Sequence, residues 1–304
     1  MSRPRRTLFR LAIAAFVVVA IVFFALALIK AWQDTDGQLP EVWRMLVTGG
    51  LAVLVLLAFG YAWAVLLGAD RRIDHLAAFL VANLGKYIPG AVWQATGQVG
   101  LAKTAGVSVK RGAAAFTVQA ITQAVSGATF CVLLAFVWTD AALVLRIVLG
   151  VGGVGAIVLI DRRWMVWVLH KIPRTRDASN DLIPGQRLIL LAYAASLFSL
   201  AATSVGYLVM LGSFGSVDNP ALIVAGYAAA WTAGFVAVPL PSGLGLREAV
   251  LVGILHGEFP AAVLVAASVY QRLVVIATEG IVAAIASHRV RPSRLRTAAT
   301  PETD

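Results

Sequence analysis

Charged residues are scarce in this chain of 304 residues, because Asp, Glu, Lys and Arg together make up only 13% of it. A soluble domain of this length carries about twice that fraction of charge. Hydrophobic residues reach 60%, and several apolar stretches attain the roughly 20 residues that a spanning helix needs. The composition therefore excludes a soluble globular protein and predicts an all-α integral membrane protein.

The residues of common catalytic and metal sites are also scarce or scattered. The single cysteine, Cys131, lies in an apolar run, which excludes a disulfide framework and a cysteine-based metal site. The four histidines show no metal-ligand spacing. Gly150-x-Gly152-x-x-Gly155 matches the glycine spacing of a dinucleotide-binding motif. It lies inside an apolar span and does not follow a strand, so it does not indicate a dinucleotide site. Because no nucleophile elbow, catalytic triad or P-loop is present, we expect no enzyme, no metal and no cofactor.

Apolar length divides the chain into six plain spans and two interrupted regions. The interrupted regions, 76–102 and 221–256, contain Pro and Gly near their middles. The first span resembles a signal peptide, but its 19 residues exceed the roughly 15 of a cleavable core, so we expect it to be retained. The plain spans lie at about 11–29, 45–67, 112–137, 141–160, 188–211 and 261–286.

We therefore expect a single membrane domain at 11–288, between a basic tail at 1–10 and a second tail at 289–304. The segment 161–187 is the one sizeable loop on the expected cytoplasmic side, and it is too short and polar for a folded domain.

The distribution of Lys and Arg predicts the topology. If each interrupted region enters and leaves on the same side, nineteen of the 25 basic residues lie on one side. Only Lys30 and Arg44 then lie in loops on the other side. A single crossing by 76–102 would export the six basic residues from 162 to 187, against the positive-inside rule. We expect re-entrant hairpins, or pairs of short crossings, in a cell inner membrane with both termini cytoplasmic.

The net charge of +10 is thus mainly a topology signal. Nucleic-acid binding would need a solvated basic domain, so we expect no nucleic-acid partner. The oligomeric state is not indicated by the sequence.

The two interrupted regions match each other in layout. Pro89 and Gly106 are 17 residues apart, and Pro241 and Gly257 are 16 apart. Each region follows one plain span and precedes another, and charge orients the two in opposite directions. This pattern predicts an inverted repeat of units at about 45–137 and 188–286, with the interrupted segments meeting at the bilayer centre. The alternative is that Pro and Gly only kink two spans.

Both interrupted regions carry motifs that resemble those of a known family. Lys86-Tyr-Ile-Pro-Gly90, followed by Trp93-Gln94 and Lys103-x-x-Gly106, is similar to the first signature of the flippase-like transmembrane domain of lysylphosphatidylglycerol synthases and their stand-alone relatives. Pro241-Ser-Gly-Leu-Gly-Leu-Arg-Glu248 resembles the second signature, with Ser242 where glycine is usual. Arg272 matches a family arginine.

The resemblance covers about 45–286 and implies the carriage of lipids across the bilayer. No soluble aminoacyl-transferase domain follows residue 286, so lysyl-lipid synthesis is not implied.

Charged side chains inside apolar segments are costly, so they usually face the protein interior and mark function. We expect Lys86, Arg247 and Arg272 to bind a lipid phosphate, with Glu248 and Glu279 holding the arginines when the site is empty. The alternative is that Arg272 pairs permanently with Glu279 or Glu248. The candidate binding residues are Lys86, Tyr87, Pro89, Gly90, Trp93, Gln94, Gln119, Gln123, Pro241, Gly243, Gly245, Arg247, Glu248, Arg272 and Glu279.

Gln119 and Gln123 belong to a polar stripe with Thr122 and Ser126, at helical spacing. The stripe either binds a headgroup or forms polar contacts between helices.

The leading functional expectation is a lipid translocase for an anionic phospholipid, a glycolipid or a polyprenyl-phosphate-linked substrate. A second possibility is a non-catalytic partner that presents lipid to a glycosyltransferase or synthase, which makes a lipid-modifying enzyme a candidate partner. A third is a membrane enzyme that acts on a lipid-linked phosphate, for which only Glu248 and Glu279 would supply acid or base.

Overall fold

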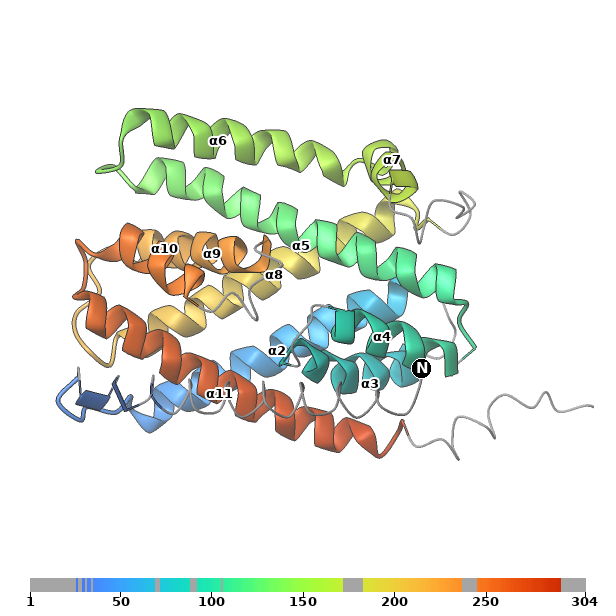
Figure 1. Cartoon of the computed structure of the whole chain (residues 1–304), viewed down its shortest axis with the longest axis horizontal. Coiled ribbons are helices and arrows are strands. Elements are labelled where there is room, and N and C mark those ends of the chain that lie inside the picture. Colours follow the sequence, from blue (N-terminus) through green and yellow to red (C-terminus); the bar gives the residue numbers. More distant parts are fainter. Residues whose placement is uncertain are drawn as a thin grey trace, which may run out of the picture.

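The computed structural model is a bundle of α-helices whose long members run roughly along the longest axis of the molecule (Figure 1). It describes residues 35–68, 72–87, 92–104, 106–171, 183–236 and 245–290, and five positions between 26 and 33. Within these residues, five helices are long and apolar enough to cross a membrane. They are α2 (Val42–Leu66), α5 (Val109–Val137), α6 (Leu143–Ile157, continued by the 3-10 helix η2 at Val158–Ile160), α8 (Gln186–Leu211) and α11 (Ala261–Ser287).

These helices confirm five of the six predicted plain spans. The sixth, 11–29, lies almost wholly outside the described residues, as do the first tail and residues 291–304. The all-α membrane fold class predicted from the composition is thereby confirmed.

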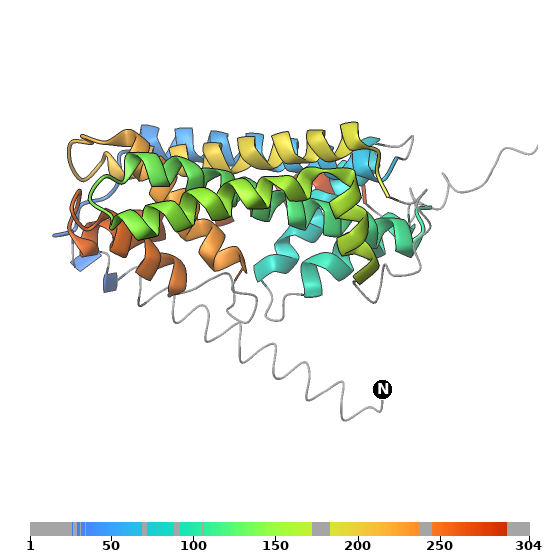
Figure 2. The same ribbon diagram turned by 90° about the horizontal axis from the view of Figure 1, so that it is seen from above.

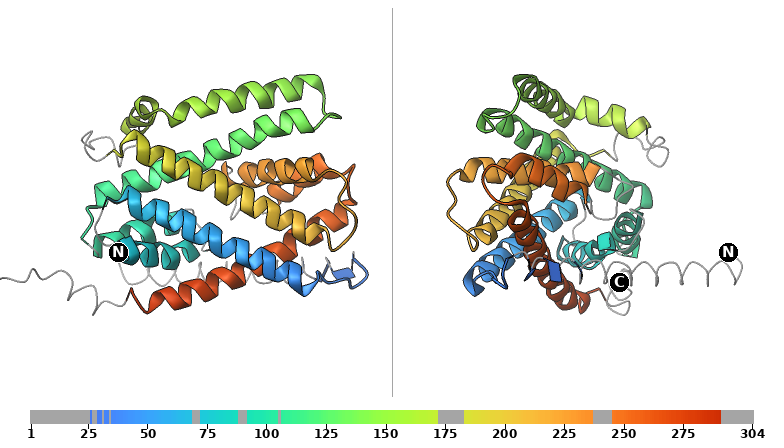
Figure 3. Two further views of the ribbon diagram at one scale, coloured as in Figure 1. Left: turned by 180° about the vertical axis from the view of Figure 1, so that it is seen from behind. Right: turned by 60° about the vertical axis from the view of Figure 1, so that its left-hand side comes forward.

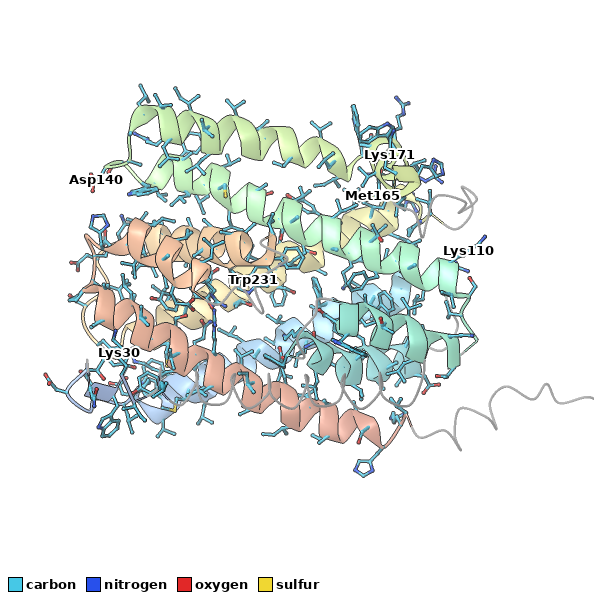
Figure 4. All side chains as sticks on the ribbon, in the orientation of Figure 1. Lys30, Lys110, Asp140, Met165, Lys171 and Trp231 are labelled. Carbon is cyan, nitrogen blue, oxygen red and sulfur yellow. The ribbon has the colours of Figure 1, made fainter. Side chains whose placement is uncertain are left out.

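Both interrupted regions form pairs of short helices. The first pair is α3 (Arg72–Ala82), prolonged by the 3-10 helix η1 (Asn83–Tyr87), and α4 (Val92–Thr104). It begins where α2 ends and leads into the start of α5, at the end of the bundle that Lys110 marks in Figure 4. The second pair is α9 (Pro220–Val236) and α10 (Leu246–Leu255), which lies toward the opposite end (Figure 1). Each pair therefore forms a hairpin whose two outer ends share one end of the bundle.

Each hairpin packs into its own hydrophobic cluster, because its apolar residues face different long helices. Phe79 of α3 is buried with Trp63 of α2, together with residues of α5 and α8. Tyr227 of α9 and Leu251 of α10 are buried with Tyr207 of α8 and residues of α11. The two clusters hold the hairpins at opposite ends of the bundle.

Small residues bring the long helices close together. Seen from behind, α2 and α8 lie side by side (Figure 3), and Thr48 of α2 donates a hydrogen bond to the carbonyl of Gly206 on α8 at 3.2 Å. A Cβ added to Gly127 of α5 would overlap the side chain of Thr232 on α9. Gly153 of α6 likewise meets the backbone of α5. Gly127 and Gly153 leave no room for a Cβ, so glycine at these positions allows the helices to approach closely.

The segment predicted as a loop at 161–187 contains a helix, α7 (Arg162–Lys171), so that prediction is wrong for these ten residues. The side chain of Asp161 accepts a hydrogen bond from the backbone N–H of Arg163 at 2.8 Å, which satisfies one free donor of the first turn. Met165 and Leu169, four residues apart, are fully buried. This helix is far shorter than the roughly 20 apolar residues of a span, so apolar length does not predict it.

Candidate functional site

Arg272 and Glu248 form an ion pair between α11 and the first turn of α10. The distance from Nη2 of Arg272 to Oε1 of Glu248 is 2.7 Å. Arg272 is the twelfth residue of α11, so the pair lies near the middle of the bundle. Nη2 of Arg272 makes no aligned hydrogen bond within the described residues. The contact is therefore an ion pair, and another acceptor at Nη2 would have to share it with Glu248 or displace that carboxylate.

Glu248 is also fixed by the start of α10. Its Oε2 accepts a hydrogen bond from the backbone N–H of Gly245 at 2.9 Å. Gly245 has a φ of +85°, which glycine adopts without strain. The Gly-x-Arg-Glu sequence thus caps the helix and aims the second carboxylate oxygen at α11.

Glu279 pairs with the inner end of the first hairpin. Its Oε1 lies 2.6 Å from Nζ of Lys86, and its Oε2 accepts a hydrogen bond from the hydroxyl of Tyr87 at 2.8 Å. Both carboxylate oxygens are therefore occupied. We expected Glu279 to hold an arginine, and this is corrected: it holds Lys86, because η1 brings Lys86 beside α11.

Arg247 is buried, with only 8% of its surface exposed. Its guanidinium lies over the ring of Tyr227, 4.4 Å from the ring centre, and that ring stacks on Tyr207 at 4.4 Å. Its Nε has no hydrogen-bond partner, and the structure shows no ion pair for Arg247 in the parts of the chain it describes. The guanidinium is close enough to Arg272 for the two positive charges to repel, and close enough to the carboxylate of Glu248 to be attracted to it.

Three cations and two carboxylates thus gather around the middle of α11. Lys86 and Glu279 neutralise one another, and so do Arg272 and Glu248. Arg247 lies within ion-pair distance of neither carboxylate, and among the described residues it is attracted to Glu248 only at longer range. With three cations and two carboxylates the cluster carries one positive charge in excess, and a buried excess charge is unfavourable by roughly several kcal/mol in a medium of low dielectric constant. The cluster is therefore arranged to receive an anion.

The remaining predicted residues lie mostly in contacts between helices. Gln94 of α4 donates to the side chain of Asn83 at 3.2 Å, and Gln119 of α5 donates to the carbonyl of Phe59 on α2 at 2.8 Å. Gln123 is buried, and its Oε1 has no hydrogen-bond partner. Trp93 is half-buried. Pro89, Gly90, Pro241 and Gly243 lie outside the described residues.

The two tyrosines beside Arg247 were not among the residues predicted from the sequence. Tyr227 donates a hydrogen bond to Oε1 of Gln271, whose Nε2 donates to the carbonyl of Thr203 at 2.7 Å. Tyr207 donates to the carbonyl of Leu264 at 3.0 Å. The position of Gln271 next to Arg272 was the one available signal, since a second polar residue at that depth needs a partner.

A bundle of long apolar helices, with two hairpins that bring charged residues to its middle, defines a multi-pass α-helical membrane protein. A family model described as the lysylphosphatidylglycerol synthase TM region matches residues 8–283, which is most of the chain. The chain therefore belongs to this family, as its two motifs predicted. The family connects the protein with membrane lipids. No curated protein matches the chain.

Proposed function

We propose that the protein binds the phosphate of a lipid headgroup at Arg247 and Arg272 and carries this lipid between the two leaflets. The observation that carries the proposal is Arg247, a buried guanidinium with no carboxylate paired to it among the described residues. Membership of the family supports a lipid as the ligand.

Phosphate suits these two arginines for chemical reasons. A guanidinium offers several N–H donors in a planar fork, and phosphate accepts them through two oxygens at once. Nε of Arg247 makes no hydrogen bond within the described residues and is available to such an acceptor, whereas Nη2 of Arg272 is held by Glu248. An arriving phosphate would compete with Glu248 for Arg272 and would balance the charge of Arg247.

The pairing of each hairpin with α11 suggests how the lipid would move. Glu248 links α10 to Arg272, and Glu279 links η1 to the same helix. We propose that units 45–137 and 188–286 form an inverted repeat, so that the hairpins approach the site from opposite leaflets. A headgroup that displaces Glu248 would loosen the hairpin of α9 and α10 while Lys86 and Tyr87 still hold the other one. Only one side of the site would then open at a time.

This proposal assigns binding and movement to the protein and no bond cleavage. Each carboxylate in the cluster already has a cationic partner, so neither is placed as a free general base. The substrate class that fits is an anionic phospholipid, a phosphate-bearing glycolipid or a polyprenyl-phosphate-linked molecule.

Transport in reconstituted vesicles tests the proposal. A fluorescent phosphatidylglycerol and a matching diacylglycerol without phosphate would be followed by chemical quenching of the outer leaflet. We expect the protein to accelerate movement of the phosphatidylglycerol only, and Arg247→Gln and Arg272→Gln to abolish the effect. Arg146→Gln is the matched control, because Arg146 lies on α6 and donates to the carbonyl of Ala135, away from the cluster. Equal transport of both lipids, or undiminished transport by both site variants, would overturn the proposal.

The same preparation separates transport from presentation to a partner enzyme. If wild-type protein binds phosphatidylglycerol through the arginines but moves none of it, the protein presents lipid instead of carrying it.

A further inference from the structure

Helix α7 lies across the end of the bundle, in a direction unlike that of the long helices. Figure 1 shows it nearly end-on beside the last turns of α6, and Figure 2 shows it running across the bundle. It follows directly from η2 at the end of α6, and it is tied to the start of α8 by a 2.8 Å hydrogen bond from the backbone N–H of Arg162 to Oε1 of Gln186. If α6 and α8 span the membrane, α7 lies parallel to its surface.

The two faces of α7 differ in chemistry. Met165 and Leu169 are fully buried and anchor the helix to the bundle. Trp164 and Trp167 point away from it, with 48% and 55% of their surfaces exposed. At 100° per residue, Lys171 falls between these two tryptophans around the helix, and both Lys171 and Arg163 are exposed. Lys171 and Met165 are labelled in Figure 4. The outer face is thus aromatic and basic together.

The exposed side chains contact one another in a way that suits a lipid surface. The rings of Trp164 and Trp167 meet edge to face at 6.2 Å, and Nζ of Lys171 lies 5.6 Å from the ring centre of Trp167. An open hollow of about 670 Å³ lies beside the start of the helix, lined by Asp161, Arg162, Arg163, Val166 and Gln186. Tryptophan favours the depth of lipid headgroups, and basic residues near it attract their phosphates.

The preceding helix supports a position of α7 beside lipid. On α6 the apolar side chains of Val144, Val148 and Val151 are more than half exposed, as expected of a helix that faces acyl chains. Because α7 continues directly from this lipid-facing helix, its outer face lies at the edge of the bundle.

We propose that the outer face of α7 binds the headgroups of anionic phospholipids at the membrane surface, through Arg163 and Lys171 with Trp164 and Trp167. This site is separate from the buried arginines and does not depend on the proposed transport. Its occupant is a bilayer lipid that holds the end of α6 and the start of α8 at the level of the headgroups.

Fluorescence quenching of the tryptophans tests the site in the full-length protein. The protein would be reconstituted in phosphatidylcholine vesicles containing a fixed fraction of either brominated phosphatidylglycerol or brominated phosphatidylcholine. The difference between wild type and Trp164→Phe/Trp167→Phe isolates the signal of α7. We expect the brominated anionic lipid to quench this signal about twofold more than the zwitterionic lipid, with the excess lost at about 1 M salt.

Charge substitutions complete the test. Arg163→Gln/Lys171→Gln is expected to remove the excess quenching, whereas Lys110→Gln/Arg289→Gln, which removes two other exposed charges, should leave it intact. Equal quenching by both lipids would show an apolar contact without headgroup selection and would overturn the proposal. Absence of quenching by either lipid would also overturn it, because the face would then meet solvent or a protein. If a charge variant does not fold, the salt dependence of quenching in the wild type still tests whether the excess quenching is electrostatic.

Discussion

Arg272 and Glu279 lie two turns apart on α11, and each pairs with a different hairpin. Arg272 contacts Glu248 of α10 at 2.7 Å, and Glu279 contacts Lys86 of η1 at 2.6 Å. Residues seven apart share a helix face, so one face of one helix joins both hairpins. This arrangement makes α11 the common support of the site.

We expect the ion pair of Lys86 and Glu279 to stabilise the fold, because each charge neutralises the other. Glu279→Gln leaves a cation without its partner and should lower the free energy of unfolding by about 1–3 kcal/mol, less than for a fully buried pair because Lys86 is 34% exposed. Lys86→Gln/Glu279→Gln removes both charges and should recover much of this loss. Unfolding in detergent, followed by circular dichroism, measures the difference. Additive losses in the double variant would contradict the pairing.

Tyr227 is expected to hold Arg247 through its ring and not through its hydroxyl. Tyr227→Phe keeps the ring face under the guanidinium and should retain most of the lipid transport. Tyr227→Leu removes the cation–π contact, worth roughly 2 kcal/mol when desolvated, and should lower transport about 30-fold. The vesicle assay compares the two variants. A loss as large in Tyr227→Phe would show that the hydrogen bond to Gln271 matters more.

The packing of the second hairpin against α5 depends on Gly127. Gly127→Ala places a methyl group into the side chain of Thr232 on α9, so we expect a loss of about 1–3 kcal/mol in the free energy of unfolding. Gly152→Ala is the matched control, because a Cβ there meets no atom within 4 Å. Unfolding of both variants in detergent checks this contact. Unchanged stability of Gly127→Ala would contradict it.

The sequence identified the spans and the hairpins because apolar length and Pro/Gly interruptions are local properties. Charge at such depth is rare, so the sequence also identified the candidate site residues Lys86, Arg247, Glu248, Arg272 and Glu279. It did not predict which carboxylate pairs with which cation. Lys86 and Glu279 are 193 residues apart, and only the packing of η1 against α11 joins them.

Other features depended on contacts that the sequence does not record. Gln119 was a candidate for headgroup binding, yet its amide contacts the backbone of α2. In the sequence, Tyr207 and Tyr227 are ordinary residues of two apolar segments. Only the packing of α8 against α9 stacks their rings beneath Arg247. Helix α7 was missed because two buried residues in ten give a weaker signal than a span.

The orientation of the bundle remains a prediction from the positive-inside rule. We expect Ser108 and both termini to face the cytoplasm and Asp140 to face the opposite side, since Lys110 and Asp140 lie at opposite ends of the bundle (Figure 4). Single cysteines at 108 and 140 in a Cys131→Ala background would be labelled with a membrane-impermeant reagent in intact and opened cells. Labelling of position 108 in intact cells would reverse the topology.

Direct binding of a phosphate-bearing lipid by the two buried arginines is the most direct test of the central claim. The purified protein would be titrated with fluorescent phosphatidylglycerol and with the matching diacylglycerol, for wild type, Arg247→Gln/Arg272→Gln and the Arg146→Gln control. We predict that wild type and control prefer the phosphatidylglycerol and that the double variant binds it at least about 30-fold more weakly, as a loss of roughly 2 kcal/mol or more requires. Equal affinity for the two lipids in the wild type, or undiminished binding by the double variant, would contradict the account.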